Sequence, residues 1–165
     1  MWTIAKIEKR KLNLLKSDLS KKLGSDFQLY NPKVILERYS LNKLKKKEIS
    51  ILGDYIFFHH RAFSRNETIS NLKFCRGLKY FLNGFLEAQN DISEFINKCK
   101  ALENSEGYLS QNIFNLEHNK SYKFITGPFV QKIFKIISFQ KNTIDIEMGN
   151  LKTKINKKCF LFNPV

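Results

Sequence analysis

Leu-Gly-Asp-Tyr-Ile-Phe-Phe, residues 52–58, decides the fold of the first hundred residues of this chain. It ends a longer segment, Ile49–Phe58, whose apolar and aromatic side chains favour a strand that is interrupted at Gly53-Asp54. Trp2–Ile7 has the same character and predicts a second, shorter strand. Because helical periodicity appears on both sides of residues 52–58, we expect an antiparallel or mixed sheet with helices packed on it, an α+β fold.

Three segments of this N-terminal part have the apolar spacing of helices. The first segment ends before Gly24, and glycine often follows the last turn of a helix. Its apolar stripe consists of Leu12, Leu15, Leu19 and Leu23. Residues 67–75 predict a short second helix, and the capping-box spacing of Asp91 and Glu94 predicts that a third helix begins at Asp91. The apolar face of that helix consists of Ile92, Phe95, Ile96, Cys99 and Leu102.

The segments between these helices predict extended structure. Residues 27–36 are expected to form a strand that is broken at Asn31-Pro32, since proline restricts the residue before it to extended conformations. Residues 78–82 predict a strand before the turn Asn83-Gly84. Lys43–Lys47 is polar and charged, and it predicts the flexible tip of a hairpin. The candidates for nucleic-acid contact in this tip are Lys45, Lys46 and Lys47.

The sequence pattern changes after residue 103. Residues 104–119 have the composition of an exposed linker, and residues 120–165 contain short segments of strand character separated by turn signals. Five short strands are expected there, at residues 121–125, 133–139, 143–148, 151–155 and 159–162. This pattern predicts a small β-barrel. The expected domains are therefore 1–103 and 120–165, joined by the linker 104–119.

The chain of 165 residues has a formal net charge of +14, which attracts polyanions and above all nucleic-acid phosphates. A second explanation stays open, because a composition rich in Lys, Asn, Ile and Phe is also typical of proteins from AT-rich genomes. The first residues lack the apolar segment of a signal peptide, and no apolar run approaches the roughly 20 residues that cross a bilayer. We expect a cytoplasmic protein that does not interact with a membrane.

The cysteines and histidines predict neither a metal site nor a catalytic centre. The three cysteines are Cys75, Cys99 and Cys159, which are far apart and lack CxxC spacing, so we expect free thiols. His59 and His60 are adjacent and are expected to point to opposite sides of a strand, while His118 lies in the linker. The sequence has no glycine-rich phosphate loop and no nucleophile elbow. The expected protein is not an enzyme and needs no cofactor.

The order of landmarks resembles the NusG family of transcription elongation factors along nearly the whole chain. The landmarks are Trp2 in the first strand, Tyr30-Asn31-Pro32, Leu52–Phe58 where the family has a pattern like F-P-G-Y-V-F-V, Arg76–Phe81, and Gly127-Pro128-Phe129. This resemblance implies an N-terminal NusG domain, a linker and a small SH3-like barrel that bears a KOW motif.

Two positions depart from the common pattern of that family. The proline of the F-P-G-Y segment is absent, and Phe134 stands where the KOW glycine is expected. Specialised relatives that resemble RfaH also have bulky apolar residues there. Their pattern around an N-terminal arginine is similar to Thr68-Ile69-Ser70 through Arg76-Gly77. The resemblance therefore implies a divergent paralogue that is specific to an operon or a DNA element.

The family resemblance also implies the binding surfaces. An apolar face of the N-terminal domain binds RNA polymerase in the family, and the matching positions here are Leu52, Tyr55 and Phe57. The alternative is that these side chains belong only to the core. Arg76 matches an arginine that lies near the non-template DNA strand in RfaH-like relatives. Further candidates for this contact, at the start of the first predicted helix, are Lys9, Arg10 and Lys11.

In the family, the C-terminal barrel recruits a ribosomal protein or the termination factor Rho, and the sequence does not choose between these partners. The residues Gly127, Pro128 and Phe129 are expected to form a tight loop of the barrel. RfaH-like barrels can refold as a helical hairpin. This switch is a further hypothesis here, because the apolar residues at 133, 134, 136 and 137 also fit one face of a helix.

The sequence leads to one main functional hypothesis and two alternatives. The main hypothesis is a monomeric elongation or antitermination factor that binds RNA polymerase. The first alternative is a ribosome-associated or RNA-binding KOW protein that does not contact polymerase. The second is a small basic nuclease, for which the sequence supplies no cluster of metal ligands.

Overall fold

The computed structural model describes residues 1–40, 43–109 and 116–165. These residues separate into two compact units. The first unit consists of Met1–Lys33 and Ser50–Ala101, and the second consists of Val34–Ile49 and Leu102–Val165. Part of the predicted linker, residues 110–115, lies outside the described residues. The division into domains 1–103 and 120–165 stays a prediction.

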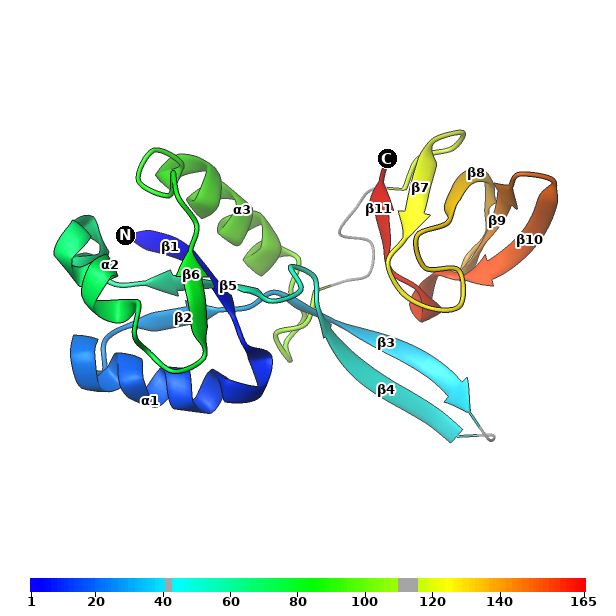
Figure 1. Cartoon of the computed structure of the whole chain (residues 1–165). Coiled ribbons are helices and arrows are strands. Elements are labelled where there is room, and N and C mark those ends of the chain that lie inside the picture. The colour runs from blue at the N-terminus through cyan, green and yellow to red at the C-terminus, as the bar shows by residue number, and fades with distance from the viewer. Residues whose placement is uncertain (41–42, 110–115) are drawn as a thin grey trace. The chain divides into compact units, whose positions relative to one another are not determined.

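A four-stranded antiparallel sheet organises the first unit (Figure 1). Its strands lie in the order β2 (Gln28–Tyr30), β5 (Tyr55–His59), β1 (Trp2–Ile7) and β6 (Leu78–Phe81). β1 pairs with β5 in a register that places Ile4 opposite Phe57. The strands predicted at residues 2–7 and 78–82 are confirmed, and the segment after Gly53-Asp54 forms β5.

Helices cover both faces of this sheet (Figure 1). They are α1 (Leu12–Leu23), α2 (Asn66–Leu72) and α3 (Gln89–Ala101). The core on the side of α1 and α2 contains Ala5 and Phe58, whereas Ile92 and Ile96 of α3 pack on the other face. Because successive side chains of a strand point to opposite faces, β1 and β5 supply apolar residues to both layers. The first unit is therefore a mixed α+β structure.

The boundaries of two helices differ from their predictions, because α2 spans Asn66–Leu72 instead of residues 67–75 and α3 begins before Asp91. α1 has the predicted extent, and Gly24 follows it with φ of +90°. α3 begins at Gln89, so the predicted start at Asp91 is wrong. The Gln89 side chain accepts a hydrogen bond from the backbone N of Trp2 at 2.9 Å and donates one to the backbone O of Trp2 at 2.7 Å. This tie to β1 holds the helix start two residues earlier than the capping-box spacing indicates.

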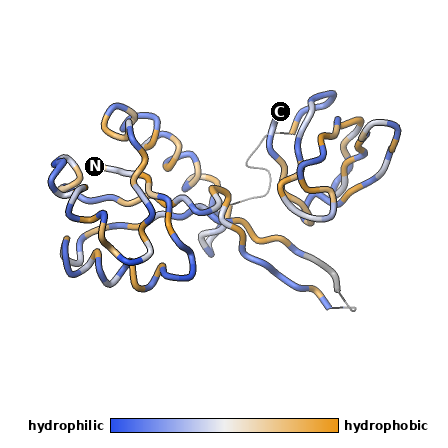
Figure 2. Tube along the Cα trace, in the orientation of Figure 1, coloured by the Kyte–Doolittle hydropathy of each residue, from blue (hydrophilic) through white to orange (hydrophobic). Residues whose placement is uncertain are grey.

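Two paired strands, β3 (Lys33–Ser40) and β4 (Lys43–Ser50), follow the predicted break at Asn31-Pro32. The prediction of a flexible tip at Lys43–Lys47 is wrong, because these residues belong to β4. Their side chains are exposed, and strand pairing satisfies their backbone groups, so a charged run can form a strand at an exposed edge. Figure 2 shows the contrast between the hydrophilic β4 and the more hydrophobic β3.

The second unit contains a five-stranded antiparallel sheet in the order β10, β9, β8, β7 and β11. The strands are β7 (Ser121–Phe124), β8 (Ile133–Phe139), β9 (Thr143–Met148), β10 (Leu151–Asn156) and β11 (Phe162–Pro164). The first four agree with their predictions to within one residue. The fifth strand is present but starts at Phe162 instead of Cys159, because Lys157–Cys159 forms a 3-10 turn, η3, in which Lys158 N donates to the Asn156 side-chain oxygen at 2.9 Å.

Aromatic rings fill the core of this second sheet. The rings of Phe124 and Phe134 lie 4.4 Å apart between centroids, and both side chains are fully buried. Tyr122 and Phe162 pack around them. Phe134, which the sequence resemblance aligns with the KOW glycine, is therefore a central core residue of β8. The residues considered for a helical hairpin all lie in β8 in this structure: Ile133, Phe134, Ile136 and Ile137.

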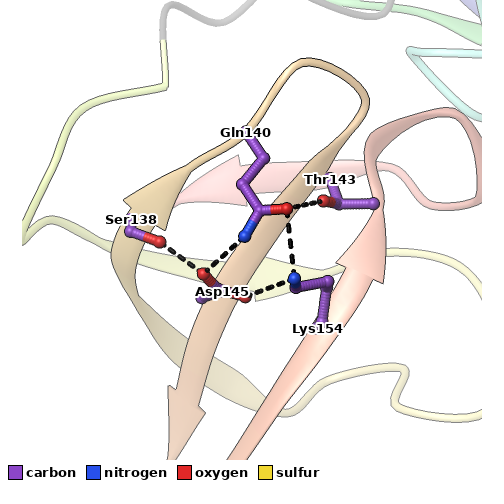
Figure 3. A network of polar contacts seen from close by, with 5 residues as sticks. All are labelled: Ser138, Gln140, Thr143, Asp145 and Lys154. Atoms are coloured by element: carbon purple, nitrogen blue, oxygen red, sulfur yellow. Dashed lines mark hydrogen bonds and ion pairs between the residues drawn. The ribbon is translucent and has the colours of Figure 1, made fainter.

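A polar network joins the ends of β8, β9 and β10 (Figure 3). Asp145 accepts hydrogen bonds from the hydroxyl of Ser138 and, at 3.3 Å, from the amide of Gln140. The side-chain oxygen of Gln140 accepts from Thr143 Oγ1 at 3.2 Å and from Lys154 Nζ at 3.1 Å. Lys154 Nζ also lies 3.9 Å from the Asp145 carboxylate. Within this network, each side chain has a polar partner.

The cysteines and histidines are dispersed. Cys75 and Cys99 are buried, and Cys159 is partly exposed; burial raises the pKa of the Cys75 thiol. His59 ends β5 and lies beside Trp2, whereas His60, the residue after the strand, packs against Phe63. Among the described residues, no group of His, Cys, Asp and Glu could hold a metal ion, and no helix has the length and apolar character of a membrane span.

Candidate functional site

A groove of about 380 Å³ opens on the α3 side of the sheet in the first unit. Its walls come from β1, from the turn before β5 and its first residues, from the residue after β6, and from the first half of α3. The lining residues are Ile4, Leu52, Tyr55, Phe57, Leu82, Asp91, Ile92 and Phe95. All are apolar or aromatic except Asp91. The structure thus brings together the three residues predicted for polymerase contact.

A tight turn places Leu52 and Tyr55 at this groove. Gly53 in the turn has φ of +60°, a conformation that glycine adopts without a steric penalty. The backbone N of Tyr55 donates to the O of Leu52 at 3.1 Å, and Ile7 N donates to Asp54 O at 2.9 Å, which fastens the turn to the end of β1. The position of Leu52 therefore depends on local backbone geometry.

Two phenylalanines form the floor and one wall of the groove. Phe57 is only 3% exposed and packs against Ile92 and Ile96 of α3. Its ring lies 5.8 Å from the ring of Phe95, which is 36% exposed. Phe57 is therefore chiefly a core residue, whereas Phe95 is accessible from the groove.

A lysine lies over two tyrosine rings next to the groove. Lys6 Nζ is 5.5 Å from the ring centroid of Tyr55 and 5.9 Å from that of Tyr80, distances typical of cation–π contacts. The two hydroxyl oxygens are 3.1 Å apart. This hydrogen bond, followed by desolvation, raises the pKa of the Tyr55 hydroxyl, which therefore stays protonated at neutral pH.

The basic residues predicted for nucleic-acid contact in the first unit lie in one region. A Cβ atom at Gly77 would lie 2.8 Å from the Cβ of Lys11, so glycine permits a close approach of the segment after α2 to the start of α1. Glu8 N also donates to Gly77 O at 2.8 Å. This contact gathers the basic residues of both segments: Lys9, Arg10, Lys11 and Arg76.

Carboxylates hold several of these cations. Arg76 donates to Asp18 from Nη2 at 2.6 Å, and from Nε and its backbone N at 3.0 Å each. Hydrogen bonds from the Arg76 side chain and backbone hold the pKa of the Asp18 carboxyl well below its usual range. Two further ion pairs in this region are Lys9 with Asp54 at 3.5 Å and Lys11 with Glu8 at 2.9 Å.

Phe74 is an exposed aromatic residue that sequence analysis did not single out. It is two residues before Arg76, is 86% exposed, and lines a depression of about 590 Å³ together with Lys22 and Thr68. The position of Phe74 after the short helix α2 carried no sequence signal for exposure, because an apolar residue there also fits a core.

The remaining predicted residues belong to the second unit. Lys45, Lys46 and Lys47 are exposed on β4, in a different unit from Arg76. Gly127, Pro128 and Phe129 lie between β7 and β8, as expected for a loop. Gly127 has φ of +89°, and a Cβ atom there would lie 2.6 Å from the ring of Phe160, so both backbone conformation and packing require glycine.

No family model matches the chain, and no curated protein matches it. The chain is similar to chains in solved Spt4:Spt5 and NusG structures. A crystal structure of the MjSpt4:Spt5 complex in conformation B has a chain that is 15% identical, with 100% of this chain and 98% of that chain covered and a TM-score of 0.33. A structure that describes domain interaction in Thermotoga maritima NusG is 14% identical, with 99% and 96% covered and a TM-score of 0.34.

Sequence analysis missed five residues that line the groove: Ile4, Leu82, Asp91, Ile92 and Phe95. The alternation of β1 and the apolar face of α3 were both visible in the sequence. The placement of α3 across only part of the sheet was not, because no local pattern reports how far a helix covers a sheet. That placement is what leaves Tyr55 and Phe95 accessible.

Proposed function

We propose that this protein is a transcription elongation factor, similar to NusG and Spt5 proteins, whose N-terminal groove binds RNA polymerase. The observation that carries this proposal is the convergence of Leu52, Tyr55 and Phe57 on one apolar groove, since these positions match the polymerase-binding face in the sequence resemblance. The protein acts as a cytoplasmic monomer, by binding and without catalysis or a cofactor.

An amphipathic helix of the polymerase is the occupant that fits this groove. Such helices lay an apolar face into an apolar groove and anchor it with a few large side chains. Leu52, Tyr55 and Phe95 are accessible from the groove, and aromatic anchors give large buried area at low cost in side-chain entropy. Phe57 supports them from below, so it acts on binding chiefly through the fold.

A pull-down of core RNA polymerase, purified from the organism that carries this protein, tests the proposal. We expect wild type and Leu14→Ala to bind and the double variant Leu52→Ala, Tyr55→Ala to lose binding. Leu14 is a matched control, because it is an apolar residue of α1 that is 42% exposed outside the groove. Equal binding by the double variant, or no binding by wild type, would refute the proposal.

The region around Arg76 is proposed to contact the non-template DNA strand in the elongation complex. Phe74 supports this role, because proteins that bind single strands combine basic side chains with aromatic rings on which bases stack. We expect single-stranded DNA binding that weakens steeply between 50 and 200 mM salt. Phe74→Ala should weaken it about tenfold, whereas Phe139→Ala, an exposed phenylalanine of the second unit, should not.

The second unit is proposed to supply a KOW-type, SH3-like barrel that recruits a ribosomal protein or Rho. Its five-stranded antiparallel sheet, aromatic core and glycine-dependent loop support this role. The buried Phe134 fits a specialised, RfaH-like antitermination factor better than a general one. Pull-downs with the purified ribosomal protein and with Rho distinguish the two partners. Binding of structured RNA in the absence of any polymerase binding would instead favour an RNA-binding KOW protein.

A further inference from the structure

We propose that the edge of the groove selects a carboxylate side chain on the incoming polymerase helix, through Lys6 and the paired hydroxyls of Tyr55 and Tyr80. This inference rests on the proposed function and adds the chemistry of the partner. The helix that binds has an apolar stripe for the groove and an Asp or Glu residue on one flank of that stripe.

The three side chains form one row across the sheet. Lys6 of β1 is the direct partner of Tyr55 in β5 and of Tyr80 in β6. Directly paired residues of neighbouring strands point to the same face, so all three side chains lie on the face that forms the groove. Ile4, two residues before Lys6, and Tyr55 itself both line the groove. The row is therefore continuous with the apolar surface.

The row presents positive charge and a hydrogen-bond donor. Two other basic residues near this end of β1 are held by carboxylates, Lys9 by Asp54 and Lys11 by Glu8, whereas none of the ion pairs among the described residues includes Lys6. In the pair of tyrosine hydroxyls one donates to the other, which leaves one hydroxyl hydrogen to donate outward. An ammonium group and a hydroxyl together match the two oxygens of a carboxylate.

Asp91 of α3 also lines the groove, and its carboxylate adds a negative charge on the side of that helix. A carboxylate on the partner is repelled there and attracted at Lys6, so the two charges together fix which flank of the helix faces β1. Charge complementarity of this kind sets orientation and discriminates against wrong partners more than it adds affinity.

Affinity measurements with core RNA polymerase at 50 and 300 mM salt test the inference. Lys6→Gln keeps a long side chain without the charge, and we expect about fivefold weaker binding at 50 mM. Lys6→Glu should weaken binding further, and both effects should shrink at 300 mM. Lys16→Glu, an equal change of charge on the exposed side of α1, should stay within about twofold of wild type.

A second variant separates the hydroxyl from the aromatic ring. Tyr80→Phe keeps the ring under Lys6 and should weaken polymerase binding about twofold to threefold, with an unchanged thermal unfolding curve. The inference is overturned if Lys6→Glu binds polymerase no more weakly than Lys16→Glu while the Leu52, Tyr55 double variant has lost binding, a result that leaves the proposed function standing. If the double variant binds like wild type, both proposals fail. Weakened DNA binding of Lys6→Glu with unchanged polymerase binding would also overturn the inference.

Discussion

The side chains in the groove of the first unit and those in the polar network of the second unit have opposite environments. In the network of Figure 3, the Asp145 carboxylate and the Gln140 side chain bond to neighbouring strand and turn residues. In the groove, apolar side chains such as Leu52 and Phe95 line an open surface. Water forms hydrogen bonds with polar groups such as those of the network, whereas contact between water and the apolar side chains of the groove is unfavourable.

Because of this difference, we expect the polar network to contribute to folding stability and the groove to contribute to binding of a partner. A polar cluster whose groups satisfy one another stabilises the turn that carries it and offers little to a partner. An apolar surface that stays accessible is retained at a cost in solubility, and such surfaces commonly mark interaction sites. Substitutions in the network should therefore change unfolding, whereas substitutions at the accessible side of the groove should change polymerase binding.

The largest change in the free energy of unfolding is expected at Phe57, whose ring lies beside that of Phe95 in the groove. Phe57→Ala removes a buried ring, and we expect a loss of about 3–5 kcal/mol in the free energy of unfolding. Phe95→Ala should cost less, about 1–2 kcal/mol, because its side chain is already partly in water, and it should still weaken polymerase binding. Urea unfolding of both variants checks this order, and equal losses would contradict it.

Substitutions in the polar network should change folding stability without changing polymerase binding. Asp145→Ala removes the acceptor of Ser138 and Gln140, and we expect a loss of about 1–2 kcal/mol in unfolding free energy with unchanged polymerase binding. Glu147→Ala on the same strand is the control, since its carboxylate has an exposed ion pair with Lys152 at 3.6 Å. A polymerase-binding defect in Asp145→Ala would show that the two regions are not separable in this way.

Two glycines with nearly equal φ values, one in each unit, provide a matched pair of variants for this comparison. Gly53 and Gly149 have φ of +60° and +57°, and a Cβ atom at either would meet nothing within 4 Å. Alanine at each should therefore cost a similar amount, about 1 kcal/mol, through backbone strain. Only Gly53→Ala should also weaken polymerase binding, because its turn positions Leu52. Parallel unfolding and binding measurements test this, and an equal binding loss in Gly149→Ala would contradict it.

The smallest effect is expected at Asp18, and it depends on pH. The pKa of this carboxyl is lowered in the folded protein, so its contribution to stability is fully present above about pH 4, the ordinary pKa of Asp, and is lost as the pH falls below that value. The difference in unfolding free energy between wild type and Asp18→Asn should be constant from pH 7 to 5 and shrink toward pH 3. A difference that does not vary with pH would show that the Arg76 pair is not responsible.

The sequence was sufficient for elements with a strong apolar period. The leucine stripe predicted α1 to the residue, and short segments of strand character between turn signals predicted β8 and β9. It was misleading where polar residues form regular structure. Lys43–Lys47 has no apolar period, yet its residues form β4, because pairing with β3 satisfies the backbone without help from the side chains.

The candidate site was predictable only in part, because it depends on long-range placement. Residues 52, 55 and 57 were reachable through the family resemblance, and they do converge. Tyr80 was not, because its place beside Lys6 follows from the pairing of β6 with β1. Near the end of the chain, apolar residues alone indicated that a strand begins at residue 159. The Asn156 side chain instead accepts a hydrogen bond from Lys158 N, and η3 follows it.

The uneven burial of the three thiols makes the native chain suitable for single-site labelling. Cys75 and Cys99 are shielded inside the first unit, whereas Cys159 is partly accessible at the end of η3. A maleimide dye should therefore attach first at Cys159, without any engineered cysteine. Its fluorescence would then report on the environment of the second unit when polymerase, a ribosomal protein or Rho is added.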